Sequence, residues 1–372
     1  MSSIWEYESW PHLVYDSPSV SEALERLYKE KQITDIAYSV IDDRTKRQLI
    51  AKSLTEDIVS SLSIEGETID LDSVYSSVSK RLDVVFMGKT KDSAYAQSIV
   101  SMVADALENH EPLTHRRLFD WHRNLFENKA GIKPKTIGAY RKGFEYVMRV
   151  SGNTHEVIYE AVPPERIQAE MDRLLSFIND RTGLDPFVKA AVASLRFVII
   201  HPFEDGNGRI SRAIAEYLIS LKAGDAFHAF NISTGILKDR SSYYEQIQAA
   251  TKDNPGMDVS KWVAWFLTMV SECIVQSRET LKKTLSVTAF MKSLDPNEFN
   301  SRQMSMLYRL ADGSFFGKLT TDKWMKLTKC SKTVAFRDIQ NLVQKGFLIP
   351  SDEAGRNQGV LFQFNDCFQF HY

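Results

Sequence analysis

The sequence has little cysteine. Its 372 residues include three, Cys273, Cys330 and Cys367, which are far apart. Disulfide frameworks and structural metal sites need cysteines at short, repeated spacings, so we expect these three to be packing residues of a reducing compartment. The longest apolar stretch, residues 262–270, is too short to span a bilayer. The first ten residues are polar and aromatic and do not resemble a secretory signal. We therefore expect a cytoplasmic protein without a membrane partner.

An excess of charge of one sign is also absent. Lys and Arg number 46, Asp and Glu 48, and the net charge is −2. No overall electrostatic field therefore favours nucleic acid as the partner. Tandem repeats and low-complexity tracts are missing too. The chain is 43% hydrophobic, which is enough for packed cores, and its length allows two or three domains. Long amphipathic runs predict a mainly α-helical fold.

The densest group of chemically capable side chains lies in residues 201–212, which read His-Pro-Phe-Glu-Asp-Gly-Asn-Gly-Arg-Ile-Ser-Arg. This segment joins an apolar run, residues 188–200, to an amphipathic run, residues 210–221. The loop therefore ends at a helix N-terminus, where backbone N–H groups and the helix dipole favour an anion. Two arginines at the start of that helix can bind phosphate oxygens. With His201 as a base and Asp205 as a metal ligand, the pattern indicates a magnesium-bound polyphosphate site, although a Gly-x-Gly alone is more often a simple turn.

Residues 201–212 resemble the signature of the Fic family, with no departure at any fixed position. The resemblance implies that His201 is the general base that takes a proton from a target hydroxyl, and that Asp205 ligates Mg²⁺ on the nucleotide phosphates. It implies transfer of AMP from ATP to Ser, Thr or Tyr of a target protein, and modification of the chain itself. The remaining nucleotide-binding positions that it implies are Gly206, Asn207, Gly208, Arg209, Ile210, Ser211 and Arg212.

A second motif, Ser61-Leu62-Ser63-Ile64-Glu65-Gly66, follows a helical pattern that ends at Gly66. Ser61 and Glu65 are four residues apart and share one helix face. By spacing alone, Glu65 is an ordinary exposed residue near a helix end. The motif also resembles the inhibitory helix of Fic proteins, which implies that Glu65 reaches the nucleotide site, pairs with Arg212 and keeps basal activity low. The same glutamate assists AMP removal in some relatives, so this reverse reaction is an alternative.

Two β-rich runs, residues 146–150 and 157–162, flank a Gly-Asn pair and predict a hairpin. In Fic proteins a flap at this place binds the target by strand addition and borders the nucleotide. The contacts that the resemblance implies there are Ile158, Tyr159, Glu160 and Ala161. It also implies that Tyr243 faces the adenine, whereas Thr251 stands where an Asn is frequent. A hairpin without such a role and a core position for Tyr243 are the alternatives.

The sequence divides into an N-terminal helical module, residues 1–110, a helical core, residues 111–285, and a C-terminal segment, residues 286–372, that begins with a short linker over 286–300. Residues 301–350 hold nine Lys or Arg against three Asp. Helical patterns followed by strands at 347–349 and 360–364 around a turn at 355–359 resemble a winged helix-turn-helix. The face that would enter a DNA groove carries Lys332, Thr333, Phe336 and Arg337.

Three functions compete on these observations. The first is a protein adenylyltransferase inhibited by Glu65. The second is a Fic enzyme with other phosphoryl chemistry or AMP removal. The third is a DNA-binding regulator whose nucleotide site is a sensor, although dimerisation or target docking explains the C-terminal segment equally well. A protein target, a second copy of the chain and DNA are therefore the partners to test.

Overall fold

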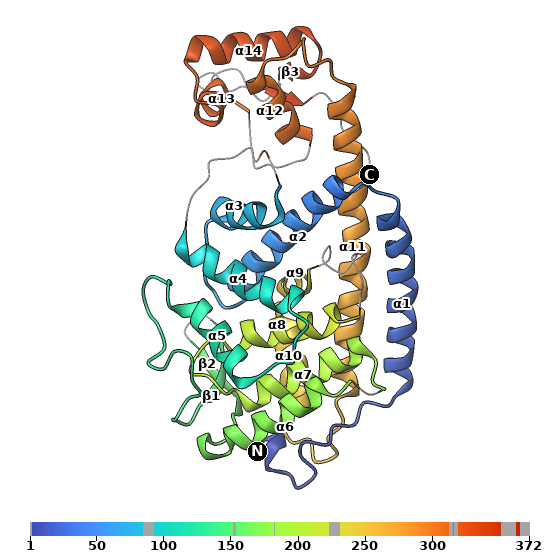
Figure 1. Ribbon diagram of the computed structural model, residues 1–372, viewed down its shortest axis with the longest axis vertical. Coiled ribbons are helices and arrows are strands. Elements are labelled where there is room, and N and C mark those ends of the chain that lie inside the picture. The colour runs from blue at the N-terminus through green and yellow to red at the C-terminus, as the bar shows by residue number, and fades with distance from the viewer. Residues whose placement is uncertain are drawn as a thin grey trace. The chain divides into compact units, whose positions relative to one another are not determined.

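The computed structural model describes residues 2–84, 93–151, 154–181, 183–222, 231–311, 315, 319–350 and 362–364. It confirms the mainly helical fold and divides the chain into two compact units, Met1–Ser277 and Arg278–Tyr372 (Figure 1). Residues 1–110 belong to the first unit together with the expected catalytic core, and one continuous hydrophobic cluster from Ile4 to Ile274 joins them.

The first unit contains ten complete helices, counted in the described part of the chain, and part of an eleventh. In chain order they are α1 (Pro18–Ser39), α2 (Asp43–Ile64), α3 (Leu71–Leu82), α4 (Ala94–Glu108), α5 (His115–Phe126), α6 (Ile167–Asn179), α7 (Pro186–Ile200), α8 (Asn207–Ser220), α9 (Ile232–Lys238), α10 (Arg240–Thr251) and α11 (Ser260–Ser293). Short 3₁₀ turns occupy Ile4–Glu6 and Pro164–Arg166. Polar caps start many of these helices, as Asp42 does for α2 by accepting from the Thr45 N–H at 3.0 Å.

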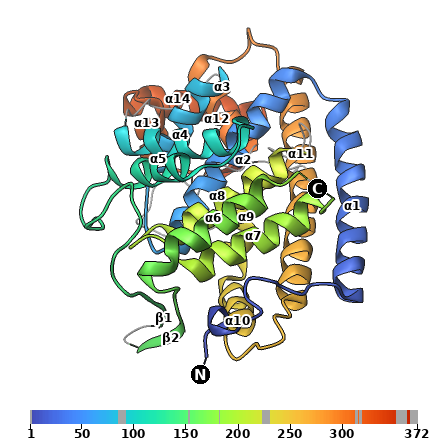
Figure 2. The same cartoon turned by 60° about the horizontal axis from the view of Figure 1, so that its bottom comes forward.

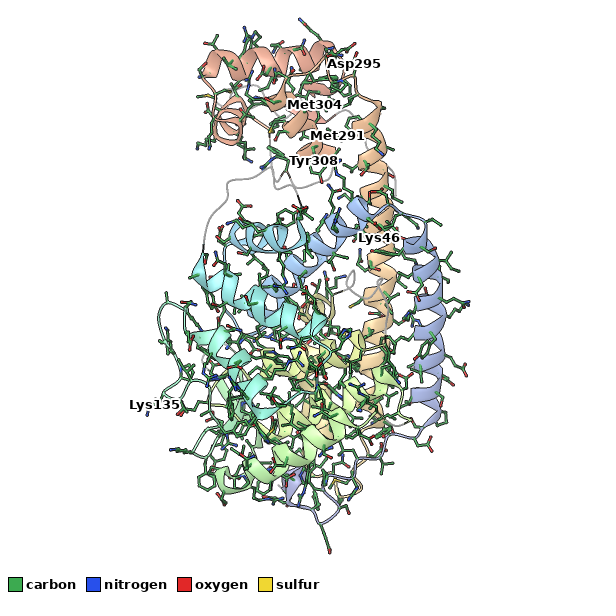
Figure 3. The ribbon with its side chains drawn as sticks, in the orientation of Figure 1. Lys46, Lys135, Met291, Asp295, Met304 and Tyr308 are labelled. Atoms are coloured by element: carbon green, nitrogen blue, oxygen red, sulfur yellow. The ribbon has the colours of Figure 1, made fainter. Side chains whose placement is uncertain are left out.

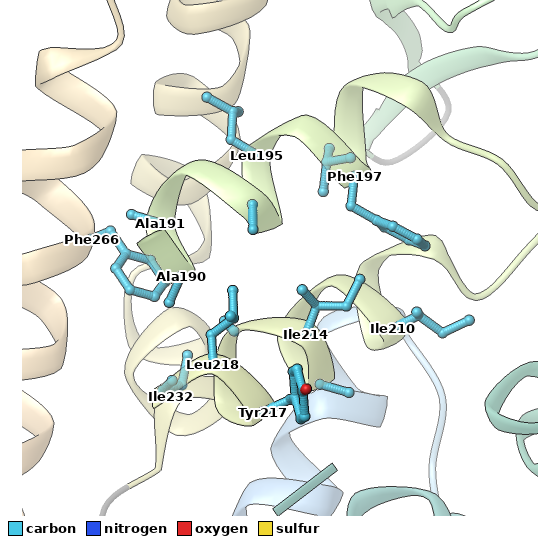
Figure 4. Packing of buried hydrophobic residues seen from close by; sticks show 14 of the residues in the cluster. Ala190, Ala191, Leu195, Phe197, Ile210, Ile214, Tyr217, Leu218, Ile232 and Phe266 are labelled. Carbon is cyan, nitrogen blue, oxygen red and sulfur yellow. The ribbon is translucent and has the colours of Figure 1, made fainter. Parts of the chain in front are cut away.

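The centre of the first unit is the antiparallel pair α7 and α8 (Figure 4). The small side chains of Ala190 and Ala191 leave space beside α7. Large side chains such as Ile214 and Leu218 of α8 pack in the same hydrophobic cluster. The connection between these two helices is the predicted polyphosphate loop. Because both helices are buried almost throughout, the loop is held between two rigid ends.

The predicted hairpin is present as β1 (Tyr146–Ser151) and β2 (Thr154–Glu160). The strands pair antiparallel with Tyr146 opposite Glu160, and the register shifts between Val147 and Met148. Gly152 and Asn153, the predicted turn residues, lie outside the described residues. The hairpin and the N-terminal segment lie at the same end of the unit in both views (Figure 2), and the Trp5 indole N–H donates to the Glu160 carbonyl at 2.7 Å.

The second unit has its own core. The end of α11 joins α12 (Ser301–Ala311), α13 (Thr321–Thr328), α14 (Lys332–Gln344) and the antiparallel strands β3 (Leu348–Pro350) and β4 (Phe362–Phe364). Met291 and Met304 pack against this core (Figure 3). The helices and strands follow the predicted order, while the predicted turn at 355–359 lies outside the described residues. The winged helix-turn-helix remains a prediction.

The expected linker over residues 286–300 is corrected in part. Helix α11 continues to Ser293, because Val287, Phe290 and Leu294 keep a helical spacing and are buried in the core of the second unit. The irregular stretch begins only at Leu294.

None of the described helices is long and apolar enough to cross a membrane. Cys273 is buried and its thiol contacts the Asn231 carbonyl, as expected of a packing residue. Cys330 is partly exposed, and Cys367 lies outside the described residues.

Candidate active site

The loop between α7 and α8 is shaped by two left-handed backbone positions. His201 ends α7 with φ of 50° while its N–H donates to the Phe197 carbonyl at 2.9 Å. Gly206 precedes α8 with φ of 86°, and a Cβ at this position would lie 3.0 Å from the Phe126 ring. Only glycine satisfies both the backbone angle and the close approach. The sharp turn directs the N–H groups of the first turn of α8 toward the loop.

The side chain of Asn207 braces this loop internally. Its Oδ1 accepts from the Phe203 N–H at 3.0 Å, its Nδ2 donates to the Phe203 carbonyl at 2.8 Å, and the residue is buried. The expected contact of Asn207 with phosphate is therefore limited to its backbone. Ile210 is fully buried and the Ser211 hydroxyl donates to the Ser194 carbonyl at 3.0 Å, so the side chains of both pack into the core. The predicted nucleotide contacts of Ile210 and Ser211 therefore stay predictions for their backbone N–H groups near the start of α8.

His201 has the tautomer that a base requires. Its Nδ1 lies 3.2 Å from the Val198 carbonyl, which can only accept, so the proton resides on Nδ1 and the lone pair on Nε2 is available. Burial lowers the pKa of His201 to about 4, and the nearby Arg141 guanidinium contributes in the same direction. The ring is therefore neutral at physiological pH. The Tyr159 hydroxyl of β2 donates to the same Val198 carbonyl, which ties the hairpin to the end of α7.

Arg141 holds the site together, a role that sequence reasoning did not identify. This residue is 3% exposed, and its Nε donates to the His201 carbonyl at 2.7 Å while its Nη2 donates to the Val162 carbonyl. Its own N–H donates to the Pro202 carbonyl at 2.9 Å. The guanidinium therefore fixes the carbonyl end of α7 against the segment that follows β2. No local sequence pattern identifies this role, because Val162 is 21 residues away and His201 is 60 residues away.

A second buried histidine positions Asp205. His122 Nδ1 accepts from the Gly138 N–H at 2.9 Å, so its Nε2 carries the proton and donates to the Asp205 carbonyl at 3.1 Å. The ring stacks on Phe203 at 4.2 Å, and burial lowers its pKa to about 4. His122 thereby holds the backbone from which the Asp205 carboxylate projects into the loop.

The carboxylate of Asp205 fits the role of a magnesium ligand. It is half-exposed, and its Oδ1 accepts from the Gly206 N–H at 2.6 Å and from Arg209 at 3.0 Å. Among the described residues no cluster of three or more His, Cys, Asp or Glu side chains could hold a metal alone. Mg²⁺ commonly binds through one or two carboxylates and completes its shell with water and substrate phosphates. Asp205 is suited to this mode.

Arg212 pairs with the segment that resembles the inhibitory helix of Fic proteins. This arginine is 3% exposed, and its Nη2 donates to Glu65 Oε1 at 2.9 Å and to the Ser61 carbonyl at 2.8 Å. Its Nε donates to the Ser61 hydroxyl at 3.0 Å. Although burial opposes it, the Glu65 carboxylate raises the pKa of Arg212. A Cβ added to Gly208 would lie 2.2 Å from Glu65 Oε1, so the carboxylate sits directly over the loop.

Arg209 pairs with Glu67, a residue that sequence reasoning missed. Its Nη1 donates to Glu67 Oε1 at 2.7 Å, and its guanidinium lies over the Phe126 ring at 5.0 Å. Lys129 donates to the same Glu67 oxygen at 2.6 Å, and the Tyr95 hydroxyl donates to Oε2 at 3.1 Å. An acidic residue directly after the helix-ending Gly66 is the signal that sequence reasoning could have used.

The end of α2 fixes both carboxylates at once. The Gly66 N–H donates to the Ser63 carbonyl and the Glu67 N–H to the Leu62 carbonyl, each at 3.0 Å, with Gly66 at φ of 76°. This pair of backbone hydrogen bonds is the Schellman cap, which needs a left-handed residue. It confirms the predicted helix stop at Gly66. It places Glu65 and Glu67 on either side of one tight turn, and they face the two arginines of the loop.

The other residues considered for the nucleotide and the flap, in α10 and the hairpin, differ in burial and in hydrogen bonding. Tyr243 is buried among Tyr244, Trp262 and Trp265, and burial raises the pKa of its hydroxyl. The Thr251 hydroxyl donates to the Ile247 carbonyl within its own helix at 2.8 Å, so its proton is already used in a hydrogen bond. In the hairpin, the Ala161 N–H donates to the Glu145 carbonyl at 3.0 Å. The side chain of Ile158 lies outside the described part.

Comparison with known proteins agrees with this geometry. The Fic/DOC family profile matches residues 112–219, and a profile described as a domain of unknown function, DUF4172, matches residues 3–84. The protein adenylyltransferase fic-1 of Caenorhabditis elegans is 27% identical over 145 residues, covering 38% of this chain and 25% of the relative. The protein adenylyltransferase Fic of Nematostella vectensis is 24% identical over 256 residues, covering 63% of this chain and 55% of the relative. The chain thus spans between a quarter and about half the length of these curated relatives.

Solved structures share the fold. A Fic family protein from Desulfovibrio desulfuricans G20 superposes with a TM-score of 0.56 at 17% identity and covers 95% of this chain and 97% of that one. Fic-1 of C. elegans superposes with a TM-score of 0.52 at 19% identity, covering 71% of this chain and 73% of that one. The complete signature loop and the matched profile lead to one conclusion: residues 112–219 of this chain form a Fic/DOC domain.

Proposed function

We propose that this protein is an adenylyltransferase that moves AMP from ATP to a Ser, Thr or Tyr hydroxyl of a protein, and that its resting state is autoinhibited. The similarity to protein adenylyltransferases supports AMP transfer. The single observation that carries autoinhibition is the ion pair between Glu65 and the buried Arg212, with the carboxylate pressed against Gly208. An anionic phosphate and this carboxylate would compete for the same guanidinium.

The chemistry is a displacement at the α-phosphorus of ATP. A target hydroxyl gives its proton to Nε2 of His201, its oxygen bonds to the α-phosphorus, and the bond to the bridging oxygen of pyrophosphate breaks. The first-turn N–H groups of α8 and the two loop arginines stabilise the charge that develops on the phosphates. Mg²⁺ held by Asp205 would neutralise phosphate charge when bound. The Val198 carbonyl keeps the His201 ring oriented throughout.

Autoinhibition acts on both arginines in this proposal. Glu65 engages Arg212 and Glu67 engages Arg209, so the groups that would bind the outer phosphates are neutralised by the end of α2. Removing one partner of a buried ion pair typically costs about 3–5 kcal/mol, which is the scale of energy available to the inhibited state. Activation then requires that the α2 terminus move away from the loop.

The flap supports a protein as the second substrate. The hairpin is a sheet of two strands in the described part of the chain, so each strand keeps one unpaired edge for an extended target segment. A second copy of the chain is the simplest target to test, since self-modification needs no other component.

The test uses full-length protein with α-labelled and γ-labelled ATP in separate reactions. We expect the Glu65→Gly variant to gain label from α-labelled ATP only, with an intact mass increase of one AMP, and His201→Ala to remove the label in either background. Transfer from γ-labelled ATP would instead support phosphate transfer, and loss of label after addition of fresh Glu65-containing enzyme would support AMP removal. Equal labelling of the parent protein and Glu65→Gly would refute autoinhibition.

DNA contact by the second unit is a second candidate. Lys332, Thr333, Phe336 and Arg337 of α14 are all exposed, which gives this helix one cationic, accessible face. A gel shift of duplex DNA by the full chain, weakening steeply with salt and abolished by Arg337→Gln, would support it. The balanced net charge and the intact catalytic loop favour the enzyme.

A further inference from the structure

A groove outside the catalytic loop is formed by the N-terminal segment where it crosses α6 and α7. Its cavity volume is about 830 Å³, within the ~300–1,000 Å³ that is usual for small-molecule sites. Figure 1 shows the N-terminal segment passing close to α6. The residues that line the groove are Trp10, Pro11, His12, Leu13, Tyr15, Asp172, Arg173, Ser176, Phe177, Val192 and Arg196.

Arg196 is the unusual member of this lining. It is 5% exposed, its guanidinium lies over the Phe177 ring at 5.2 Å, and its Nε has no hydrogen-bond partner among the described residues. Burial lowers its pKa to about 10, so it stays charged at neutral pH. A buried guanidinium with an unpaired N–H is costly unless a negative group approaches it.

Glu170 is the carboxylate that interacts electrostatically with Arg196, but both of its oxygens already accept hydrogen bonds from other residues. Glu170, whose side chain is 1% exposed, accepts from Arg166 at 3.0 Å and Arg173 at 3.1 Å through one oxygen. Its other oxygen accepts from the Trp10 indole at 2.9 Å. Arg196 interacts with the same carboxylate only electrostatically, so three arginines share one buried carboxylate and the local charge is positive.

Asp172 also lies on the lining, but its carboxylate faces other partners. Its Oδ1 is 2.7 Å from His115 Nε2 and accepts from Gln168 at 3.1 Å, and the side chain is 58% exposed. It therefore forms a rim and leaves the floor at Arg196 positive. The rest of the lining is mostly aromatic and aliphatic, with His12 and Ser176 as its other polar members.

The groove is separate from the nucleotide loop. Ser194 of α7 contacts α8 through its carbonyl, which accepts from Ser211. Arg196 of the same helix points instead toward α6, where its guanidinium lies over the Phe177 ring, and the residues that line the groove include none of the loop. Nothing in the proposed AMP transfer uses this face.

We propose that this groove binds a small organic anion with a flat apolar body, in which the negative group pairs with Arg196 and Arg173 and the body packs against the partly exposed Leu13 and Tyr15. An aromatic carboxylate is the simplest ligand of this class. The N-terminal segment supplies one wall, and it also contacts β2 through the bond from Trp5 to Glu160. Occupancy therefore tightens the segment that borders the flap.

The test is calorimetric titration of the full chain with 1-naphthoate and with 1-naphthalenemethanol, which has the same ring system without the charge. We expect one naphthoate per chain and an affinity at least about tenfold above that of the alcohol, because a bond to a charged group discriminates by this factor or more. Arg196→Met should abolish the preference for the carboxylate, and the exposed Arg173→Gln should reduce it.

The controls distinguish loss of the site from loss of the fold. Arg196→Lys keeps the charge and should retain a weakened preference, and Arg116→Gln removes an arginine that does not line the groove and should change nothing. A cooperative thermal transition in each variant verifies folding. If Arg196→Met does not fold, Arg173→Gln and Arg196→Lys decide the question. Equal affinity for the acid and the alcohol, or naphthoate binding unchanged in Arg173→Gln and Arg196→Lys, overturns the proposal, as does failure of naphthoate to bind.

Discussion

The turn that ends α2 places two carboxylates on the two loop arginines, and a double-variant experiment measures what each contributes. The variants are Glu65→Gly, Glu67→Gln and both together. Arg212 is 3% exposed and its Glu65 partner 28%, so we take the lower end of the cost of breaking a buried pair, about 3 kcal/mol. If this energy maintains the inhibited state, Glu65→Gly raises the rate about 100-fold, since ~1.4 kcal/mol corresponds to a factor of ten.

Glu67 should contribute less. Arg209 keeps Asp205 as a partner at 3.0 Å after the change, and Lys129 shares the same Glu67 oxygen, so only a charged hydrogen bond of about 1.5–3 kcal/mol is lost. In the parent background Glu65 still blocks Arg212, and Glu67→Gln alone should raise the rate less than about tenfold. In the Glu65→Gly background the same change should add about a further factor of ten, because Arg209 becomes available to the departing pyrophosphate.

The assay is the initial rate of self-labelling with α-labelled ATP at fixed protein concentration, together with the affinity for a non-hydrolysable ATP analogue. Glu108→Gln is the matched control, because it removes an exposed ion pair with Arg81 on another face. A double variant that is slower than Glu65→Gly would refute the reasoning about Glu67. It would show that Glu67 orients Arg209 for catalysis and does not restrain it.

Three further predictions follow from single groups. Because burial holds the pKa of His201 at about 4, the labelling rate of Glu65→Gly should be flat from pH 6 to 8, and a rate that titrates near pH 6.5 would contradict a buried neutral base. Gly66→Ala forces a side chain onto φ of 76°, at a cost of about 1–2 kcal/mol, and should raise basal labelling while lowering the Tm; unchanged labelling would count against the turn as the holder of both carboxylates. Burial and the neighbouring Asp57 carboxylate raise the pKa of Glu216 well above its usual value. The contribution of Glu216 to stability is therefore complete below about pH 4.5 and is lost as the pH rises through its folded-state pKa. Glu216→Gln should raise the Tm at pH 8 more than at pH 5, and an equal change at both pH values would be the contrary result.

The local features of this chain were predictable because they depend on residues close in sequence. The apolar runs on either side of residues 201–206 predicted two helices and a loop, and the structure has α7 and α8 there. The pairing of Glu65 with Arg212 is not local, since the residues are 147 apart; it was predicted only from the resemblance, and the ion pair is present. The prediction of a linker over 286–300 was wrong for its first half. Val287 and Phe290 are buried in the core of the second unit, and the helix continues through them to Ser293. The irregular stretch that does follow contains Asp295-Pro296.

The sequence by itself determined the chemistry that the loop can perform, since the order of histidine, carboxylate, glycines and arginines is local and a helix start follows directly. Only the tertiary structure decided how those groups are held. Arg209 meets Glu67 across 142 residues, and the Asp205 carbonyl meets His122 across 83. Such contacts arise from the packing of α2 and α5 around α8, and side-chain periodicity along one segment carries no information about a partner so far away. The family signature thus identified the reacting groups, and the packing of distant helices set their tautomers, charges and resting partners.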